Sequence, residues 1–127
     1  MIYGIGCDIV KVSRFVKWVE NDSLIKRFFN KNEMMTVETS SLQRKCEYYA
    51  VRFAAKESFS KALGTGLKGF ELTDIYIEKD ADGKPVMRVI GNAAVELEKN
   101  CGKDAKIYVS LSHEKEYAVA YVIIERG

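Results

Sequence analysis

Two acidic residues, Asp8 and Glu57, are candidate ligands for a cation. Asp8 follows a run of apolar residues and glycines at positions 2–7, where it is either solvated or bound to a hard cation. Glu57 lies beside apolar side chains of a long predicted helix, and a carboxylate in such a place is neutralised, paired or bound to a metal. Two carboxylates without a histidine suit Mg²⁺, which prefers oxygen ligands and also binds substrate phosphates. The pair predicts a Mg²⁺ site; the alternatives are a solvated Asp8 and an ion pair between Glu57 and Lys61.

Basic residues recur along the same predicted helix. Lys45, Arg52 and Lys56 fall on one narrow stripe at about 100° per residue, on a helix that is apolar nearly all round. A solvated face is the usual interpretation of such a stripe, but this helix has little room for one, so a bound polyanion is favoured. Lys61 and the turn Gly64-Thr65-Gly66 extend the pattern, because backbone N–H groups of a glycine-rich turn suit phosphate oxygens. The turn could equally be a simple helix stop.

The only histidine, His113, lies in a polar segment at the end of a predicted strand. A lone histidine is more often structural than catalytic, but this setting also makes it a candidate hydrogen-bond donor to a phosphate. The net charge of +2 is too small to indicate a nucleic-acid partner, and the aromatic residues of the long helix are expected to be buried rather than exposed for base stacking.

The composition is that of one globular domain, which we expect to span residues 1–127. Hydrophobic residues make up 47% and charged residues 30% of the chain, and there is one proline. No apolar run approaches the roughly 20 residues of a membrane span, and no signal peptide is recognised. Cys7, Cys46 and Cys101 lack the spacing of a zinc site, so we expect reduced thiols in a cytoplasmic protein.

The elements that would position these residues predict an α+β fold, with a largely antiparallel sheet packed on a long buried helix. Gly4, Gly6 and Asp8 share one face of the first strand. Glycines inside a strand usually mark the close approach of another backbone or of a ligand, and we expect this bare face to clear space for a bulky ligand beside Asp8. The predicted elements of the first half are a strand over 2–10, a short helix capped by Ser13, a helical stretch over 23–29, a helical turn and loop over 30–40, and the long helix over 41–63, which serines precede and the glycine-rich turn ends. Strands over 72–79 and 85–90 are expected to form a hairpin, because Asp82-Gly83 is a good hairpin signal. A helix over 92–99 and strands over 106–112 and 117–125 complete the prediction.

Four segments, in this order, resemble the holo-[acyl-carrier-protein] synthases, the small phosphopantetheinyl transferases. They are GIGCDIV at 4–10, RFAAKESFSKALGTG at 52–66, KDADGKP at 79–85 and SLSHEKEYAVA at 110–120. Residues 27–33 also look like the family's second short motif, with Asn30 where threonine is common.

The resemblance implies an enzyme of fatty acid biosynthesis. It would transfer 4′-phosphopantetheine from coenzyme A to a serine of apo acyl carrier protein, giving holo carrier protein and 3′,5′-ADP. The family is typically a cytoplasmic homotrimer with each site between neighbouring subunits. The resemblance also implies site residues: Asp8 and Glu57 for the metal; Lys56, Ser60, Lys61, Gly64 and Thr65 for coenzyme A; and Arg44, Lys45 and His113, beside Arg52 of the basic stripe, for the adenosine phosphate end.

The chemistry expected of these residues is phosphoryl transfer. Mg²⁺ would bridge the pyrophosphate, Lys61 would stabilise the departing 3′,5′-ADP, and Glu57, directly or through a water on the metal, is the candidate base for the carrier's serine. The alternative function is a non-catalytic coenzyme A or nucleotide-binding module. Such a module needs the basic helix but not two carboxylates, so Asp8 with Glu57 favours the enzyme.

A carrier-docking surface is predicted on the helix after Ser13. Arg14 and Lys17 are three residues apart and share a helix face, and Trp18 lies one turn beyond Arg14. Because acyl carrier proteins are acidic, this basic and aromatic patch suits transient docking; the alternative is an ordinary solvated face.

Overall fold

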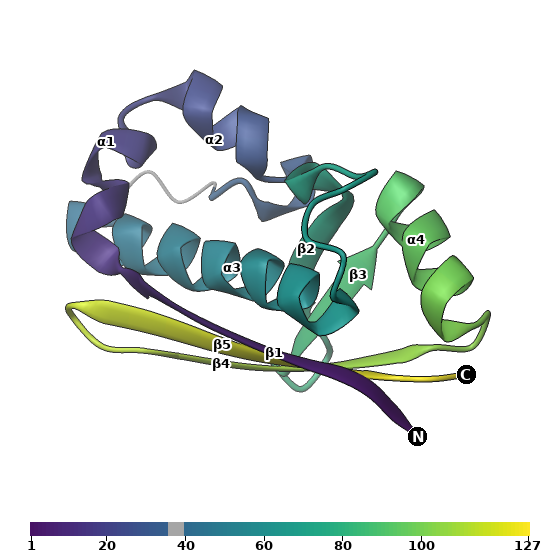
Figure 1. Ribbon diagram of the computed structural model, residues 1–127. Coiled ribbons are helices and arrows are strands. Elements are labelled where there is room, and N and C mark those ends of the chain that lie inside the picture. Colours follow the sequence, from purple (N-terminus) through teal and green to yellow (C-terminus); the bar gives the residue numbers. More distant parts are fainter. Residues whose placement is uncertain (36–39) are drawn as a thin grey trace.

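A three-stranded antiparallel sheet forms one layer of the protein, and a long helix crosses one of its faces (Figure 1). The structure, a computed structural model, describes residues 1–35 and 40–127. The α+β class with a largely antiparallel sheet is confirmed. In the order β1-β5-β4, the sheet contains β1 (Ile2–Lys11), β5 (Tyr117–Glu125) and β4 (Lys106–His113), and the helix is α3 (Leu42–Leu63).

Several of the remaining elements pack against the sides of α3 that the sheet leaves open (Figure 1). The predicted hairpin is confirmed as an antiparallel pair, β2 and β3, in which Ile75 lies opposite Val89. None of the helices in the described part of the chain is long and apolar enough to cross a membrane. The elements are η1 (Val12–Phe15), α1 (Val16–Val19), α2 (Asp22–Phe28), η2 (Lys31–Glu33), η3 (Leu72–Asp74), β2 (Ile75–Lys79), β3 (Pro85–Val89) and α4 (Gly91–Cys101).

Two boundaries differ from the prediction near the N-terminus. Ser13 lies inside η1 and makes no capping hydrogen bond, whereas Asn21 caps α2 by accepting from the backbone N–H groups of Ser23 and Leu24. The prediction of a turn and loop over 30–40 is met in part by η2, while residues 36–39 lie outside the described residues.

The two ends of α3 follow local capping chemistry. The Ser41 hydroxyl accepts from the backbone N–H of Arg44 at 3.1 Å. At the other end, Gly64 adopts a left-handed conformation with φ of 83° and donates its N–H to the Ser60 carbonyl at 3.0 Å. These signals explain why the sequence located this helix to within one residue.

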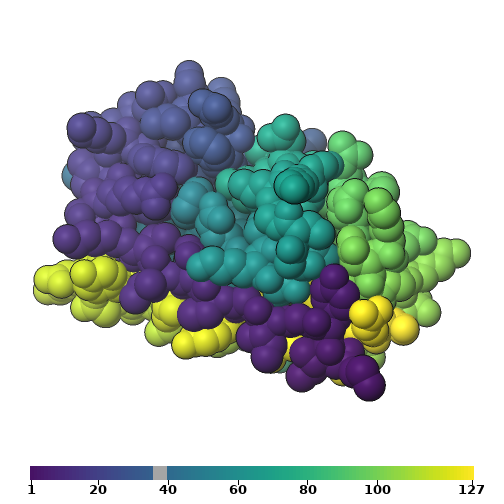
Figure 2. All heavy atoms as spheres, in the orientation of Figure 1, coloured from purple at the N-terminus to yellow at the C-terminus, as the bar shows by residue number. Residues whose placement is uncertain are grey.

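Strand β1 packs backbone to backbone against α3. A Cβ atom added to Gly4 would lie 1.9 Å from the carbonyl oxygen of Ala62, and one added to Gly6 would lie 1.8 Å from that of Ser58. The expectation that this bare face clears space for a ligand is therefore wrong, because the helix backbone fills it. In the space-filling view, β1 lies against the teal segment that includes the end of α3 (Figure 2).

We predict that Gly6→Ala destabilises the protein at the upper end of the roughly 1–3 kcal/mol typical of overpacking, because the new methyl group meets backbone that cannot rotate away. Urea denaturation measures the change, with Ser110→Ala in an exposed position of β4 as the control. A denaturation midpoint for Gly6→Ala equal to that of the control would contradict this close approach.

Candidate active site

Asp8 and Lys61 connect β1 to the last turn of α3. The Lys61 ammonium lies 3.1 Å from an oxygen of Asp8 and also donates to the carbonyl of Cys7 at 3.0 Å. The Asp8 side chain is 18% exposed and that of Lys61 is 56% exposed, so the pair lies at the rim of the helix–sheet interface. The ion pair that Lys61 forms is therefore with Asp8, across the interface, and not with Glu57 on its own helix.

Glu57 is half-buried beside this pair. Burial raises the pKa of its carboxyl above the usual range, and the nearby negative charge of Asp8 raises it further, while Lys61 and Arg14 lower it. Among the described residues, Glu57 has no ion pair, and Lys61 is paired with Asp8 alone. The local charge balance thus favours a further cation next to Asp8 and Glu57.

The donor set at this point contains two carboxylates. The described residues include no group of three or more histidine, cysteine or acidic side chains that could hold a metal by themselves. Two oxygen ligands fit Mg²⁺, which keeps several waters and takes its remaining ligands from substrate phosphates. The residues present therefore fit the predicted metal.

A cavity of about 320 Å³ adjoins Glu57. The Gly64 N–H is committed to the helix cap, so that donor is not free for a phosphate as the glycine-rich turn had suggested. Thr65 is half-buried outside the lining, and its hydroxyl donates to the Gly66 carbonyl at 3.4 Å. The cavity is lined by Glu57, Ser60, Lys61, Gly64, Gly66 and Leu67, of which Leu67 had not been predicted.

A second cavity, of about 510 Å³, brings together Arg44, Arg52 and His113 from α3 and the end of β4. It also contains Lys79, the first residue of the KDADGKP segment, which had not been predicted as a site residue. Its remaining lining residues are Met35, Glu47 and Tyr48. Four basic side chains and one acidic side chain, that of Glu47, therefore surround this cavity, which we call the cationic cavity.

The two cavities lie on different sides of α3. Arg52 and Glu57 are five residues apart, which places their side chains roughly 140° from each other around the helix axis. The cavities also share no lining residue. A single chain therefore does not join the carboxylates and the cationic cavity in one pocket.

The basic stripe predicted for α3 is divided by tertiary packing. Lys45 lines a third cavity, of about 310 Å³, with Val19 and Lys26 of α1 and α2. Arg52 lines the cationic cavity with Arg44. Lys56 is fully buried and reaches neither cavity. A helix enclosed on all sides places neighbouring stripe positions against different elements, which periodicity alone cannot reveal.

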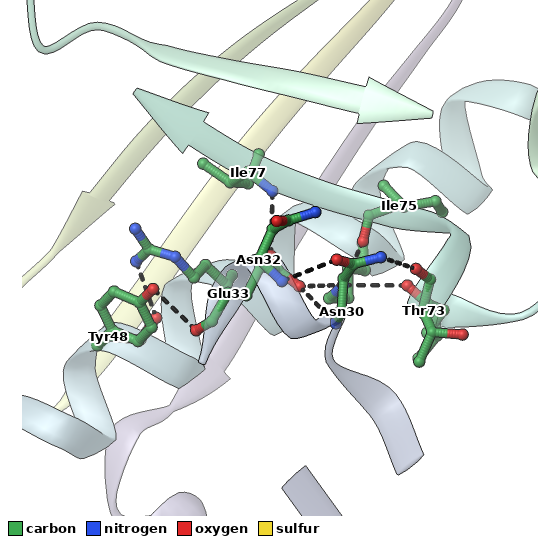
Figure 3. A network of polar contacts seen from close by, with 10 residues as sticks. Asn30, Asn32, Glu33, Tyr48, Thr73, Ile75 and Ile77 are labelled. Atoms are coloured by element: carbon green, nitrogen blue, oxygen red, sulfur yellow. Dashed lines mark hydrogen bonds and ion pairs between the residues drawn. The ribbon is translucent and has the colours of Figure 1, made fainter. Parts of the chain in front are cut away.

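Lys56 belongs to a buried polar network that joins α3 to η2 and β2 (Figure 3). Its ammonium lies 2.6 Å from a carboxylate oxygen of Glu33 and donates to the carbonyls of Leu72, at 3.0 Å, and Ile75. The other oxygen of Glu33 accepts the N–H of Ile77 at 3.0 Å. Three donors of Lys56 thus meet three acceptors inside the protein, and the prediction that Lys56 contacts coenzyme A is wrong.

The predicted docking residues lie at the edge of an aromatic cluster. Arg14 and Lys17 are exposed, whereas Trp18 is half-buried and packs with its ring centroid 5.3 Å from that of Phe53. The Arg14 guanidinium carbon lies 5.1 Å from the Phe53 ring centroid, and its charge also acts on Glu57. The patch is therefore basic at its surface, with Trp18 partly withdrawn into the core.

Comparison with known proteins relates the whole chain to one family. Residues 4–122 match the model of the 4′-phosphopantetheinyl transferase superfamily. A holo-[acyl-carrier-protein] synthase of Treponema denticola is 50% identical over 98% of this chain and 99% of its own. Among solved structures, the synthase of Bacillus anthracis in complex with CoA (3′,5′-ADP) is 35% identical with a TM-score of 0.81, covering 100% and 99% of the two chains. That of Neisseria meningitidis is 33% identical with a TM-score of 0.86, covering 99% and 100%.

The buried network generates a stability prediction. Lys56→Met leaves the Glu33 carboxylate buried without its counter-charge and should cost about 3–5 kcal/mol in unfolding free energy. Adding Glu33→Gln removes that charge and keeps an acceptor for Ile77, so the double variant should recover part of the loss. Urea denaturation of the two single variants and the double variant measures this coupling. Wild-type stability of Lys56→Met, with weakened coenzyme A binding, would return Lys56 to the ligand surface.

Proposed function

This chain belongs to the holo-[acyl-carrier-protein] synthases of the 4′-phosphopantetheinyl transferase superfamily, and we propose that Asp8, Glu57 and Lys61 carry its chemistry. It transfers the 4′-phosphopantetheine group from coenzyme A to a serine of apo acyl carrier protein, giving holo carrier protein and 3′,5′-ADP. The observation that carries the assignment is the pair of neighbouring carboxylates beside a cavity that Lys61 and Ser60 also line.

In the proposed reaction, the serine oxygen of the carrier forms a bond to the β-phosphorus, and the bond from that phosphorus to the oxygen of the leaving 3′,5′-ADP breaks. Glu57 is the candidate to accept the serine proton, since burial and Asp8 raise the pKa of its carboxyl. Lys61, whose side chain is 56% exposed, is the residue we propose to donate to the oxygen that gains charge on the leaving group.

Asp8 and Glu57 would hold Mg²⁺, which supplies neutralisation of the pyrophosphate charge when it is bound. The same pair argues against the alternative of a non-catalytic coenzyme A or nucleotide-binding module. Such a module would need the cationic cavity but would gain nothing from two carboxylates that repel the phosphates of its ligand.

The cationic cavity is proposed to take the adenosine phosphate end of coenzyme A. The space of about 510 Å³ is surrounded by hydrogen-bond donors from basic side chains, those of Arg44, Arg52, Lys79 and His113. Guanidinium groups bind phosphate oxygens through two parallel hydrogen bonds, which adds geometric specificity to the charge attraction.

A homotrimer is proposed because the outer face of the sheet is apolar and exposed. Ile5 and Ile9 of β1 are 62% and 63% exposed, and Tyr121 of β5 is 52% exposed. Large exposed apolar patches mark interaction surfaces. A neighbouring copy would also resolve the separation of the two cavities, because the carboxylates of one chain could then meet the cationic cavity of the next.

The carrier protein is proposed to dock on Arg14, Lys17 and Trp18. Arg14 and Lys17 are exposed, and Arg14 acts electrostatically on Glu57, so an acidic partner held there would lie close to the carboxylates. Charges at such a rim mainly accelerate encounter and are screened by salt.

The three cysteines are free, which accords with a reducing, cytoplasmic location for this step of fatty acid biosynthesis.

Asp8→Asn and Glu57→Gln should each lower turnover at least about 100-fold while the fold survives, because each removes one charged ligand at the pyrophosphate. Mass spectrometry of apo carrier protein incubated with enzyme, coenzyme A and Mg²⁺ measures the transfer, and Glu98→Gln on α4 is the control.

EDTA should abolish wild-type activity, and Mg²⁺ or Mn²⁺ should restore it. Full activity in metal-free buffer would refute the metal assignment.

The shared-site prediction is tested by mixing two impaired variants. Asp8→Asn removes a carboxylate, and Arg52→Ala weakens the cationic cavity. If one site draws on two chains, co-expression should give more activity at sub-saturating coenzyme A than either variant gives alone. A mixture no more active than the better single variant would rule out the shared site.

The oligomer is tested by light scattering. Ile9→Lys should lower the mass from three chains, whereas Val95→Lys, at an equally exposed position of α4, should not. A fully active monomer would also rule out the shared site.

A further inference from the structure

Tyr48 makes two contacts that together hold Arg52. Its hydroxyl donates to the backbone carbonyl of Glu33 at 2.8 Å, which fixes the ring against η2. The guanidinium carbon of Arg52 lies 3.5 Å from the centroid of that ring, and one terminal nitrogen of Arg52 donates to the Tyr48 carbonyl at 3.2 Å. Figure 3 shows Tyr48 reaching toward Glu33 at the edge of the buried network.

The charge of Arg52 is not neutralised by the carboxylate nearest to this cluster. Glu33 is committed to Lys56 at 2.6 Å and to the backbone N–H groups of Ile77 and Asn30. Arg52 is 9% exposed, and its Nε is buried without a hydrogen-bond partner among the described residues. A buried polar group without a partner is costly, so it is retained where a ligand or water completes it.

We propose that Tyr48 is a positioning residue for recognition of the 3′-phosphate of coenzyme A, acting by stacking Arg52 in the wall of the cationic cavity. The inference rests on the proposed assignment of that cavity to the adenosine phosphate end. A phosphate needs the in-plane N–H donors of a guanidinium. Stacking on the ring face occupies only the flat side of the group, so the terminal N–H donors that the Tyr48 carbonyl does not use remain available at its edge.

The hydrogen bond from the Tyr48 hydroxyl to the Glu33 carbonyl anchors the tyrosine ring. Burial raises the pKa of the phenol, so it keeps its proton and remains a donor at physiological pH. The anchor also links two parts of the protein that the sequence separates, because Glu33 lies on η2 while Arg52 and Tyr48 lie on α3. The buried network thereby sets the position of a side chain in the cavity.

The experiment compares the Michaelis constants for coenzyme A and dephospho-coenzyme A. Tyr48→Phe keeps the ring and loses the anchor, and it should raise KM for coenzyme A about fivefold. Tyr48→Leu also loses the stack and should raise it about 20-fold. Neither variant should change KM for dephospho-coenzyme A or kcat. Tyr3→Phe, which loses a hydroxyl bond to the Leu63 carbonyl at the other end of α3, is the matched control.

A double-mutant comparison separates positioning from a general structural role. If Tyr48 acts through Arg52, then adding Tyr48→Leu to Arg52→Ala changes nothing further in the KM ratio of the two donors. The proposal would be overturned if Tyr48→Leu raised KM equally for both donors, or if its effect on the KM ratio added to that of Arg52→Ala in the double variant. If Arg52→Ala removes the discrimination but Tyr48→Leu does not, only the positioning role falls. A wild-type enzyme that treats both donors alike would overturn the cavity assignment as well.

Discussion

The close approach of β1 to α3 is the constraint on which the proposed active site depends. Gly4 and Gly6 allow the strand backbone to contact the carbonyl oxygens of Ala62 and Ser58, and any larger residue would separate the two elements. Asp8 is the next residue on that face of the strand, so it lies beside the last turns of α3, where Lys61 and Glu57 project. The carboxylates are neighbours because two backbones touch.

A second constraint acts on the other side of the same helix. The ion pair of Glu33 with Lys56 fastens α3 to η2 and β2 inside the core, and every hydrogen-bonding group of the lysine is used there. Buried ion pairs add little net stability unless they are fully hydrogen-bonded, and this one is. Because Glu33 is neutralised by Lys56, it leaves the positive charge of Arg52 free for a ligand.

Together the two constraints give α3 two chemically different sides. One presents carboxylates and Lys61, and the other presents Arg52 among the basic residues of the larger cavity. Phosphoryl transfer from coenzyme A needs both kinds of group on one ligand. A helix cannot bring its opposite sides together by itself, so the exposed apolar face of the sheet, with Ile5, Ile9 and Tyr121, acquires a functional meaning in the assembly we propose.

The sequence by itself determined the features that depend on local chemistry. The serines before α3 and the glycine after it located this helix, the Asp-Gly turn located the hairpin, and the resemblance of four segments indicated the family. Tertiary structure alone decided which groups each side chain contacts. Periodicity placed Lys45, Arg52 and Lys56 on one stripe, but different elements pack around the helix, so the three side chains lie in three environments. The glycines of β1 predicted a close approach but not which atoms would fill it. Local propensity is a property of neighbouring residues, whereas burial, ion pairing and cavity lining depend on segments that only folding brings together.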